Sequence, residues 1–283
     1  MKKLPAIQLA LVMLAVALMG ASPSTESALK TMADSEREFA QVCAQKGIRD
    51  SFLQYFRDDV VTFGNKLRVG TEHLKKRSNN DPLRYKLQWL PTYGDVSKSG
   101  DLGYLTGASI LEDTKGENEG WRGQYFSIWT KGADGWKVAV DFGATTPQAI
   151  FKPGAAFVRA PQKTVKLASL KSGGSIEEAE QQFHSTASDA SSQQATCDAA
   201  APYLHFYRDN EAPIESREAL CKNGGSGDKR DYKMLKQASS GDLGYAYGEY
   251  QSADQKAGAY LHVWKRSSDK WMLVAAVEKV NIE

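Results

Sequence analysis

The chain has 283 residues, 41% of them hydrophobic, and a formal net charge of +2 at pH 7. This length allows two domains of ordinary size, each with a hydrophobic core of its own. The charge is too close to neutral to indicate a nucleic-acid partner, because proteins that bind nucleic acids usually carry a strong basic patch.

The first 22 residues have the pattern of a secretory signal peptide. Lys2 and Lys3 precede an apolar run over residues 9–19, and small residues follow at 20–22. The run is shorter than the ~20 apolar residues that span a bilayer, and small residues of this kind precede signal-peptidase cleavage sites. We therefore expect residues 1–22 to be removed and the protein to be periplasmic or secreted from a bacterium, without membrane contact after cleavage. An uncleaved anchor is the alternative.

The rest of the chain contains an internal repeat, which determines the expected domain organisation. The hexapeptide Ser-Gly-Asp-Leu-Gly-Tyr at residues 99–104 returns unchanged at 240–245. An aromatic pattern at 52–58 recurs at 203–209, and a pattern with two tryptophans at 123–136 recurs at 258–271. These matches predict a tandem duplication with a first domain over residues 23–142, a Pro- and Gly-rich linker over 143–174, and a second domain over 175–283.

Each copy begins with helical patterns and continues with strand patterns. Residues 24–47 carry apolar side chains at a spacing near 3.6, a shorter helix follows, and residues 60–69 fit a small hairpin. From residue 85 the period changes to two, in the stretches 85–97, 102–111, 121–130 and 136–142. Turn residues between these stretches predict an antiparallel meander. Helices followed by strands indicate an α+β fold, with the helices on one face of a curved sheet.

The cysteines predict one disulfide. Cys197 and Cys221 lie in the second copy, and the first copy has no cysteine at the matching positions. A bridge between them is the simplest pairing in an exported chain, and it leaves Cys43 as a buried free thiol. The chain has no Cys-x-x-Cys or His-x-x-x-His spacing and no Gly-rich phosphate loop, so we expect neither a metal site nor a cofactor.

The order of these elements and several local sequences resemble the nuclear transport factor 2-like superfamily, specifically its SnoaL-like and ketosteroid isomerase-like branches. The residues that carry the resemblance are Phe39, the helix-to-strand passage at 55–64, Val69-Gly70, the repeated hexapeptide, and Trp129 to Trp136. The resemblance covers both copies and is weaker in the second. It implies two cone-shaped domains, each a bent antiparallel sheet packed on N-terminal helices, with a mouth that can hold a small molecule. It implies no particular activity.

The isomerase-like branch directs attention to an early-strand carboxylate at the mouth of the cone. Asp58 recurs as Asp209, which indicates a structural role, whereas Asp59 is replaced by Asn210 in the second copy. Asp59 is therefore the one candidate general base, with a turn-stabilising role as the alternative. We expect a ligand site in the first domain formed by Tyr55, Asp59, Trp89 and Phe126.

Residues of the third long strand alternate between the two faces of the sheet. The purely apolar set, Phe126 and Ile128 with their counterparts Leu261 and Val263, suits the concave face under the helices. The aromatic side chains with polar groups suit an interface between the two domains. This interface set consists of Tyr125, Trp129, Tyr260, His262 and Trp264, and it predicts an intrachain pseudo-dimer.

The sequence leaves three functions open. The leading hypothesis is a non-catalytic exported protein that binds a small apolar or amphipathic molecule or a protein partner. The alternative is an isomerase or hydro-lyase in which Asp59 acts as general base and Tyr55 or Trp89 shapes the pocket. The third is a structural module without a ligand. No motif in the chain names a reaction.

Overall fold

The computed structural model describes residues 24–64, 66–77, 84–117, 119–146, 149–162, 174–189, 191–222, 228–252 and 257–280. The expected signal peptide, residues 1–22, lies outside these ranges, as does most of the C-terminal part of the expected linker. Within the described ranges, no helix is long and apolar enough to cross a membrane.

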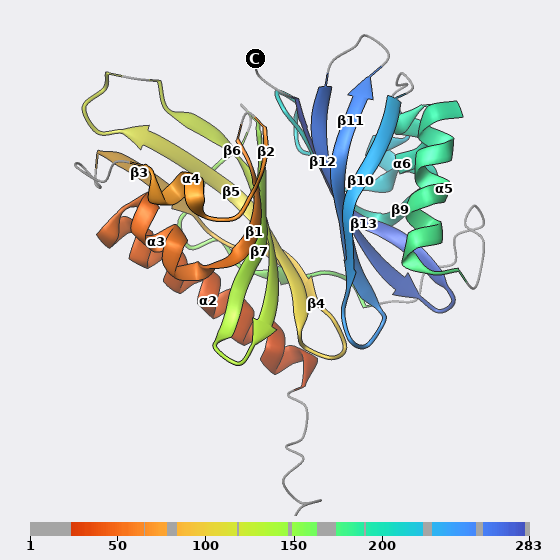
Figure 1. The fold of residues 1–283 in the computed structure, drawn as a ribbon, viewed down its shortest axis with the longest axis horizontal. Helices are drawn as coiled ribbons and strands as arrows, with labels where there is room; N and C mark the ends of the chain where they lie inside the picture. The colour runs from red at the N-terminus through yellow and green to blue at the C-terminus, as the bar shows by residue number, and fades with distance from the viewer. Residues whose placement is uncertain are drawn as a thin grey trace, which may run out of the picture.

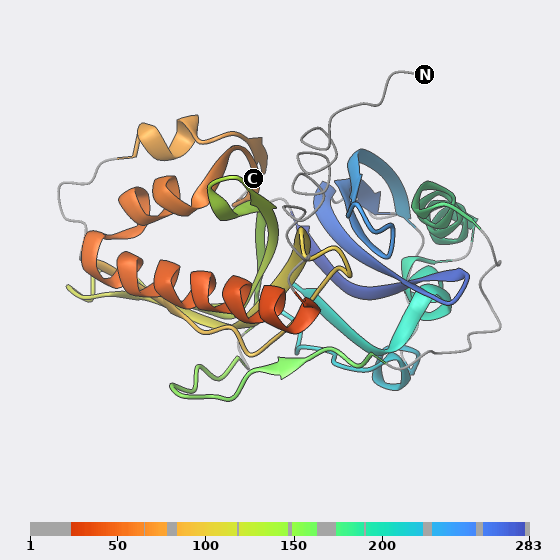
Figure 2. The same ribbon diagram turned by 90° about the horizontal axis from the view of Figure 1, so that it is seen from below.

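The chain is an α+β protein built around two sheets that face each other, with helices on their outer sides (Figure 1). Figure 2 shows the same layers from below. The N-terminal half contains α2 (Thr25–Lys46), α3 (Ile48–Tyr55), β1 (Phe56–Phe63), β2 (Leu67–Val69), α4 (Glu72–Lys75), β3 (Tyr85–Trp89), β4 (Tyr93–Val96), β5 (Leu102–Asp113), β6 (Trp121–Gly132), β7 (Gly135–Thr145) and β8 (Val158–Arg159). The C-terminal half contains α5 (Ile176–Asp189), α6 (Ser192–Ala199), β9 (Ala200–Arg208), α7 (Arg217–Leu220), β10 (Asp228–Gln237), β11 (Leu243–Ser252), β12 (Ala257–Ser267) and β13 (Lys270–Val280).

The two sheets share one strand arrangement. The first has the order β2-β1-β7-β6-β5-β4-β8, with β3 also paired to β5, and the second has the order β10-β11-β12-β13-β9. The long strands form the predicted antiparallel meander. In each half the strand that follows the helices, β1 or β9, pairs in parallel with the last meander strand, β7 or β13. Both sheets are therefore mixed rather than purely antiparallel, because the first strand of each half lies beside the last meander strand and runs in the same direction.

Helix α2 forms where the apolar spacing predicted it. The Ser24 side chain accepts a hydrogen bond from the Ser27 amide at its N-terminus, which satisfies a donor that the helix itself leaves free. Gly47 ends the helix with a φ of 81°, a conformation that costs glycine little. The buried face includes Met32 and Phe39, so the helix packs on the first sheet.

The sheets pack against each other through largely hydrophobic faces, which also carry tyrosines such as Tyr104 and Tyr245. One hydrophobic cluster contains residues of both sheets, among them Phe126, Ile128, Leu261 and Val263. The sequence-based assignment of the strand faces is therefore wrong, because this set forms the interface between the halves and not the faces under the helices.

The aromatic side chains with polar groups lie under the helices instead. Tyr125 and Trp129 belong to the core cluster under α2, and Trp264 belongs to the cluster under α5. Tyr260 and His262 bond to side chains of α5. The physical reason is that α2 and α5 supply hydrogen-bond partners for Trp129, Tyr260, His262 and Trp264.

The repeated hexapeptides meet each other in this interface. The Lys98 amide donates to the Asp242 carboxylate at 3.1 Å, and the Ser239 amide donates to the Asp101 carboxylate at 3.1 Å. The hydroxyl groups of Ser99 and Ser240 lie 2.8 Å apart. Each contact has its counterpart at the matching position of the other copy, so the two turns are related by a local pseudo-two-fold axis, the arrangement of an isologous interface.

The expected linker begins later than the sequence suggested. Residues 143–145 continue β7, and β8 pairs in parallel with β4 through Val158 and Arg159. The apolar and Pro-containing stretch after residue 145 is thus partly attached to the first sheet. Residues 163–173 lie outside the part of the chain that the structure describes.

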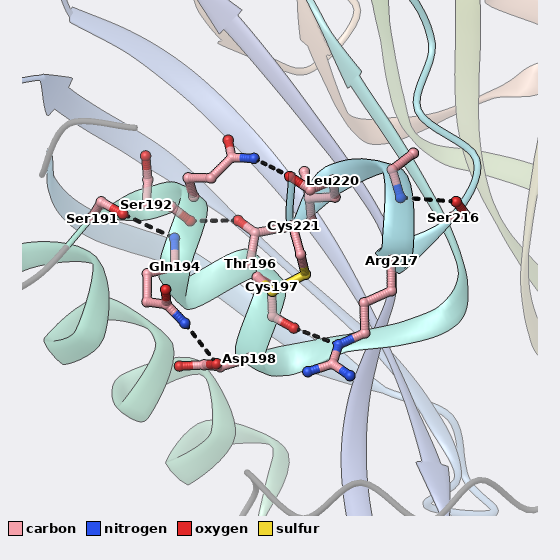
Figure 3. The surroundings of a disulfide bond; sticks show 12 residues. Ser191, Ser192, Gln194, Thr196, Cys197, Asp198, Ser216, Arg217, Leu220 and Cys221 are labelled. Atoms are coloured by element: carbon pink, nitrogen blue, oxygen red, sulfur yellow. Dashed lines mark hydrogen bonds between the residues drawn. A yellow bond between two sulfur atoms is a disulfide. The ribbon is translucent and has the colours of Figure 1, made fainter. Parts of the chain in front are cut away.

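The predicted disulfide between Cys197 and Cys221 is confirmed, with the Cα atoms 5.4 Å apart. It joins α6 to the end of α7, where Arg217 Nε also donates to the Cys197 carbonyl at 2.8 Å (Figure 3). The bridge and this hydrogen bond hold the segment after β9 against the outer helices. Cys43 is a buried free thiol on α2, as expected.

The symmetry of the hexapeptide contact generates a prediction. Asp101→Ala and Asp242→Ala should each lower the free energy of unfolding by about 1–2 kcal/mol, because each leaves a backbone amide of the opposite turn without its acceptor. Urea unfolding of the two variants should give nearly equal losses. Asp134→Ala, in the exposed turn between β6 and β7, is the control and should change little. A large loss for one hexapeptide aspartate with none for the other would contradict the pseudo-symmetric contact.

Candidate functional site

A buried glutamate of α2 organises the interior of the first half. Glu36 is 1% exposed, and its carboxylate accepts three hydrogen bonds from the sheet. Trp89 Nε1 donates at 2.6 Å, Ser127 Oγ at 2.7 Å and Trp129 Nε1 at 2.7 Å. Burial raises the pKa of Glu36, although the three donors counteract the rise. The arrangement attaches the helix to the concave face of the sheet.

The second half contains the same feature with different partners. Glu180 of α5 is fully buried and accepts from Trp264 Nε1 at 2.6 Å. His262 Nδ1 lies 3.0 Å and His184 Nε2 lies 2.9 Å from the same carboxylate. Burial acts to raise the pKa of Glu180, but the neighbouring His262 and His184 lower it, and the lowering prevails.

Sequence reasoning missed both glutamates. The signal was present: Glu36 stands three residues before Phe39, and Glu180 stands three residues before Phe183, at matching positions of the two copies. Each is a charged residue on the apolar face of an amphipathic helix, where an acidic side chain is almost never buried without partners. Such a position marks a carboxylate that the fold must satisfy.

A cavity of about 380 Å³ lies between α2, α3 and the concave face of the first sheet. Most of its wall is aromatic or aliphatic, and its polar side chains are few. The lining residues that matter for the chemistry are Glu36, Trp89, Ser109, Tyr125, Ser127 and Asp141, with Lys279 contributed by the second half.

Small side chains keep this cavity open. Ser109 lies opposite Trp89 on the paired strands, and Gly143 lies opposite Tyr125. In the second sheet the matching pairs are Tyr250 opposite Arg230 and Glu278 opposite Tyr260. These larger side chains occupy the space between the second sheet and its helices that corresponds to the cavity of the first half.

Arg230 is the centre of that filled interior. Its guanidinium lies 5.3 Å from the Tyr250 ring centre and 5.1 Å from that of Tyr260, and it pairs with Glu278 at 2.5 Å. Arg208 lies 2.7 Å from the other oxygen of Glu278. Burial opposes ionisation of Glu278, but the two guanidinium groups lower its pKa to about 2. The second half is therefore organised by buried ion pairs where the first half has space.

Two further polar side chains belong to the residues around the cavity, Tyr125 and Asp141. The Tyr125 hydroxyl is buried, and it has no hydrogen-bond partner within the part of the chain that the structure describes. Asp141 of β7 lies beside the cavity on the same face as Gly143. Burial, and to a lesser degree the nearby Glu36, raise its pKa to about 8. At neutral pH most Asp141 carboxyl groups are thus protonated and can donate a hydrogen bond.

Three of the four sequence-predicted ligand residues, Tyr55, Trp89 and Phe126, lie in three different parts of the first half. Trp89 lines the cavity as expected. Tyr55 is buried and stacks on Phe39 with ring centres 4.8 Å apart, so it supports the wall from behind. Phe126 is fully buried in the interface between the sheets and belongs on the opposite face. The expectation for these last two residues is corrected accordingly.

Asp59 does not have the environment of a buried general base. Its carboxylate is half-exposed and pairs with Arg57 at 2.7 Å and with Lys236 of the second half at 3.8 Å. The hydrogen bond from Arg57 is the main cause that lowers its pKa. Asp59 lies within β1, so these ion pairs link strand residues and not residues of a turn. Among the residues that the structure describes, no group of three His, Cys, Asp or Glu side chains could hold a metal ion.

No protein-family model and no curated protein sequence matches the chain. Solved structures that are similar to it include an NTF2-like protein of Shewanella oneidensis (TM-score 0.31, 13% identity, 37% of this chain and 95% of that one). Another is an NTF2-like protein of Cytophaga hutchinsonii (TM-score 0.32, 13% identity, 37% and 94%). A third is the association domain of CaMKII from C. elegans (TM-score 0.35, 13% identity, 43% and 98%). The similar structures thus include members of the superfamily that the sequence resembles.

The raised pKa of Asp141 predicts a pH-dependent stability. The folded state binds this proton more tightly than the unfolded state, in which the aspartate pKa is near 4. The contribution of Asp141 to stability should therefore be greatest below pH 4 and fall as the pH rises towards 8. The Asp141→Asn variant has no carboxyl group at this position to ionise. The difference between its free energy of unfolding and that of the wild type should therefore change in favour of the variant by about 2 kcal/mol or more between pH 5 and pH 9.

Urea unfolding at both pH values measures this effect. Asp59→Asn is the control, because the pKa of Asp59 is lowered and its removal should bring no gain at high pH. An equal difference between wild type and Asp141→Asn at pH 5 and pH 9 would show that Asp141 ionises normally in the folded state.

Proposed function

We propose that the first half of this protein binds a small, mostly apolar molecule that carries an acceptor oxygen, and that the second half serves as its structural partner. The single observation that carries the proposal is the cavity under α2, whose wall is mostly aromatic or aliphatic with few polar side chains. A volume near 380 Å³ falls within the range of ligand pockets, which are mostly apolar with a few placed polar groups.

The polar groups of the cavity determine what such a ligand offers. Glu36 already accepts three hydrogen bonds and is therefore part of the wall. Tyr125 and protonated Asp141 are donors. A carbonyl, ether or hydroxyl oxygen of the ligand would accept a hydrogen bond from protonated Asp141.

The cellular location and the domain division complete the proposal. A disulfide between Cys197 and Cys221 suits an oxidising compartment, and this supports export by a signal peptide at residues 1–22. Two similar sheets related by a local pseudo-two-fold contact support a tandem duplication. In this proposal the first domain keeps the ligand site, and the second has exchanged its cavity for ion pairs.

A cavity-filling variant tests ligand binding. Ser109→Tyr introduces the side chain that the second sheet carries at the matching position, Tyr250, so it should fill the cavity and weaken binding by about 10-fold or more. The probe is the neutral fluorescent naphthyl ketone 6-propionyl-2-(dimethylamino)naphthalene, titrated with the wild type. Ser109→Ala is the matched control. If the wild type fails to bind the probe, or Ser109→Tyr binds it equally well, the site is not this cavity.

A second candidate function is proton transfer to or from a carbonyl compound in the same cavity. The observation in its favour is the Asp141 pKa of about 8, because a carboxyl that gives and takes its proton near neutral pH suits general acid–base catalysis. This assigns to Asp141 the role that sequence reasoning assigned to Asp59.

Deuterium exchange at the carbon next to the carbonyl of 2-propionylnaphthalene, followed by NMR in D₂O, tests this function. Asp141→Asn should lower the protein-dependent rate by ~100-fold, whereas Asp59→Asn should leave it unchanged. Exchange no faster than in buffer would reject catalysis on this ketone while leaving the binding proposal intact.

A further inference from the structure

One cationic side chain reaches the cavity of the first half, and it comes from the second half. Lys279 lies on β13 and lines the cavity together with Thr145 of β7. It is the only Lys, Arg or His among the described residues of the cavity wall. With 8% of its surface exposed, it is nearly buried, which is unusual for a lysine.

Asp209 holds Lys279 in place. Its carboxylate accepts from Lys279 Nζ at 2.8 Å and from the Thr145 amide at 2.9 Å. The Val280 amide donates to the other oxygen at 3.2 Å. Two backbone N–H groups thus orient the Asp209 carboxylate, and one N–H of the Lys279 ammonium donates a third hydrogen bond to it. An ammonium has three N–H donors, so Lys279 keeps donors beyond the one that Asp209 uses.

The cation and the uncharged donor lie at different ends of one cavity. Thr145 and Asp141 are both on β7 and both line the cavity. Four residues of strand separate positions by ~13 Å. Lys279 lies at the end of the cavity near Thr145, because Asp209 binds both residues. Asp141 lies towards the other end. Aromatic and aliphatic side chains of the first half lie between them.

We propose that the ligand of this cavity is an apolar acid, an aromatic or aliphatic molecule whose carboxylate or sulfonate pairs with Lys279 of the second half. This inference rests on the proposed binding function and adds the ligand class. The site is incomplete without the second half, because that half supplies the only cation among the described residues of the wall. An ion pair with this largely buried lysine is stronger than one on the surface, and the charge-assisted bond gives orientation as well as affinity.

A pair of probes with the same ring system separates this inference from the proposed function. 8-Anilinonaphthalene-1-sulfonate carries a sulfonate, and N-phenyl-1-naphthylamine is its neutral counterpart. The full chain should bind both, and Lys279→Met should weaken binding of the sulfonate by about 10-fold or more while changing that of the neutral probe less than about two-fold. Lys279→Arg should retain most of the sulfonate affinity, because it keeps the charge.

Lys236→Met is the matched control. Lys236 also belongs to the second half and pairs with the first half, at 3.8 Å from Asp59, but it does not line the cavity. It should leave both affinities unchanged. Equal weakening of both probes by Lys279→Met, or no weakening of either, would overturn the assignment of the anionic group to Lys279. Failure of the wild type to bind even the neutral probe would instead reject the proposed function.

Discussion

The structure of each half depends on one interaction, a buried helix carboxylate that accepts an indole N–H from the sheet. Glu36 with Trp129 and Glu180 with Trp264 stand at matching positions of the two copies. A carboxylate without partners in such a place would cost several kcal/mol. The strand residues that carry polar groups must therefore face the helix. This requirement orients every strand of the meander, because side chains alternate between the two faces.

The opposite face of each sheet is then left with mostly hydrophobic side chains, which must be covered to exclude water. In this chain the two apolar faces cover each other, with Phe126 and Leu261 in the same cluster. The hexapeptide turns meet at the end of the contact and exchange equivalent hydrogen bonds through Asp101 and Asp242. An identical sequence in both copies is explained by this contact, since a symmetric interface places the same demands on both partners.

The two halves use the same scaffold for different interiors. Small residues such as Ser109 and Gly143 leave a cavity in the first, at some cost in packing. Tyr250 and Glu278 close the equivalent space in the second, where Glu278 pairs with buried guanidinium groups. Buried ion pairs of this kind add little net stability compared with an apolar core. Glu278, which these ion pairs hold, directly precedes Lys279, and Lys279 lines the first cavity.

The sequence alone determined the α+β class, the first helix, the meander and the Cys197–Cys221 bridge. These follow from local periodicity, turn chemistry and residue counts, which tertiary contacts rarely override. It also brought Trp89 into the candidate site. It did not determine which strand face meets the helices, because Tyr125 and Phe126 alternate equally well in either orientation.

Only the tertiary structure resolved that choice, through Glu36 and Glu180, whose partners are more than 50 residues away in sequence. For the same reason it moved the candidate acid from Asp59, which pairs with its neighbour Arg57, to Asp141, whose pKa depends on burial among distant elements. Burial and long-range pairing are properties of the folded chain. A local pattern records neither.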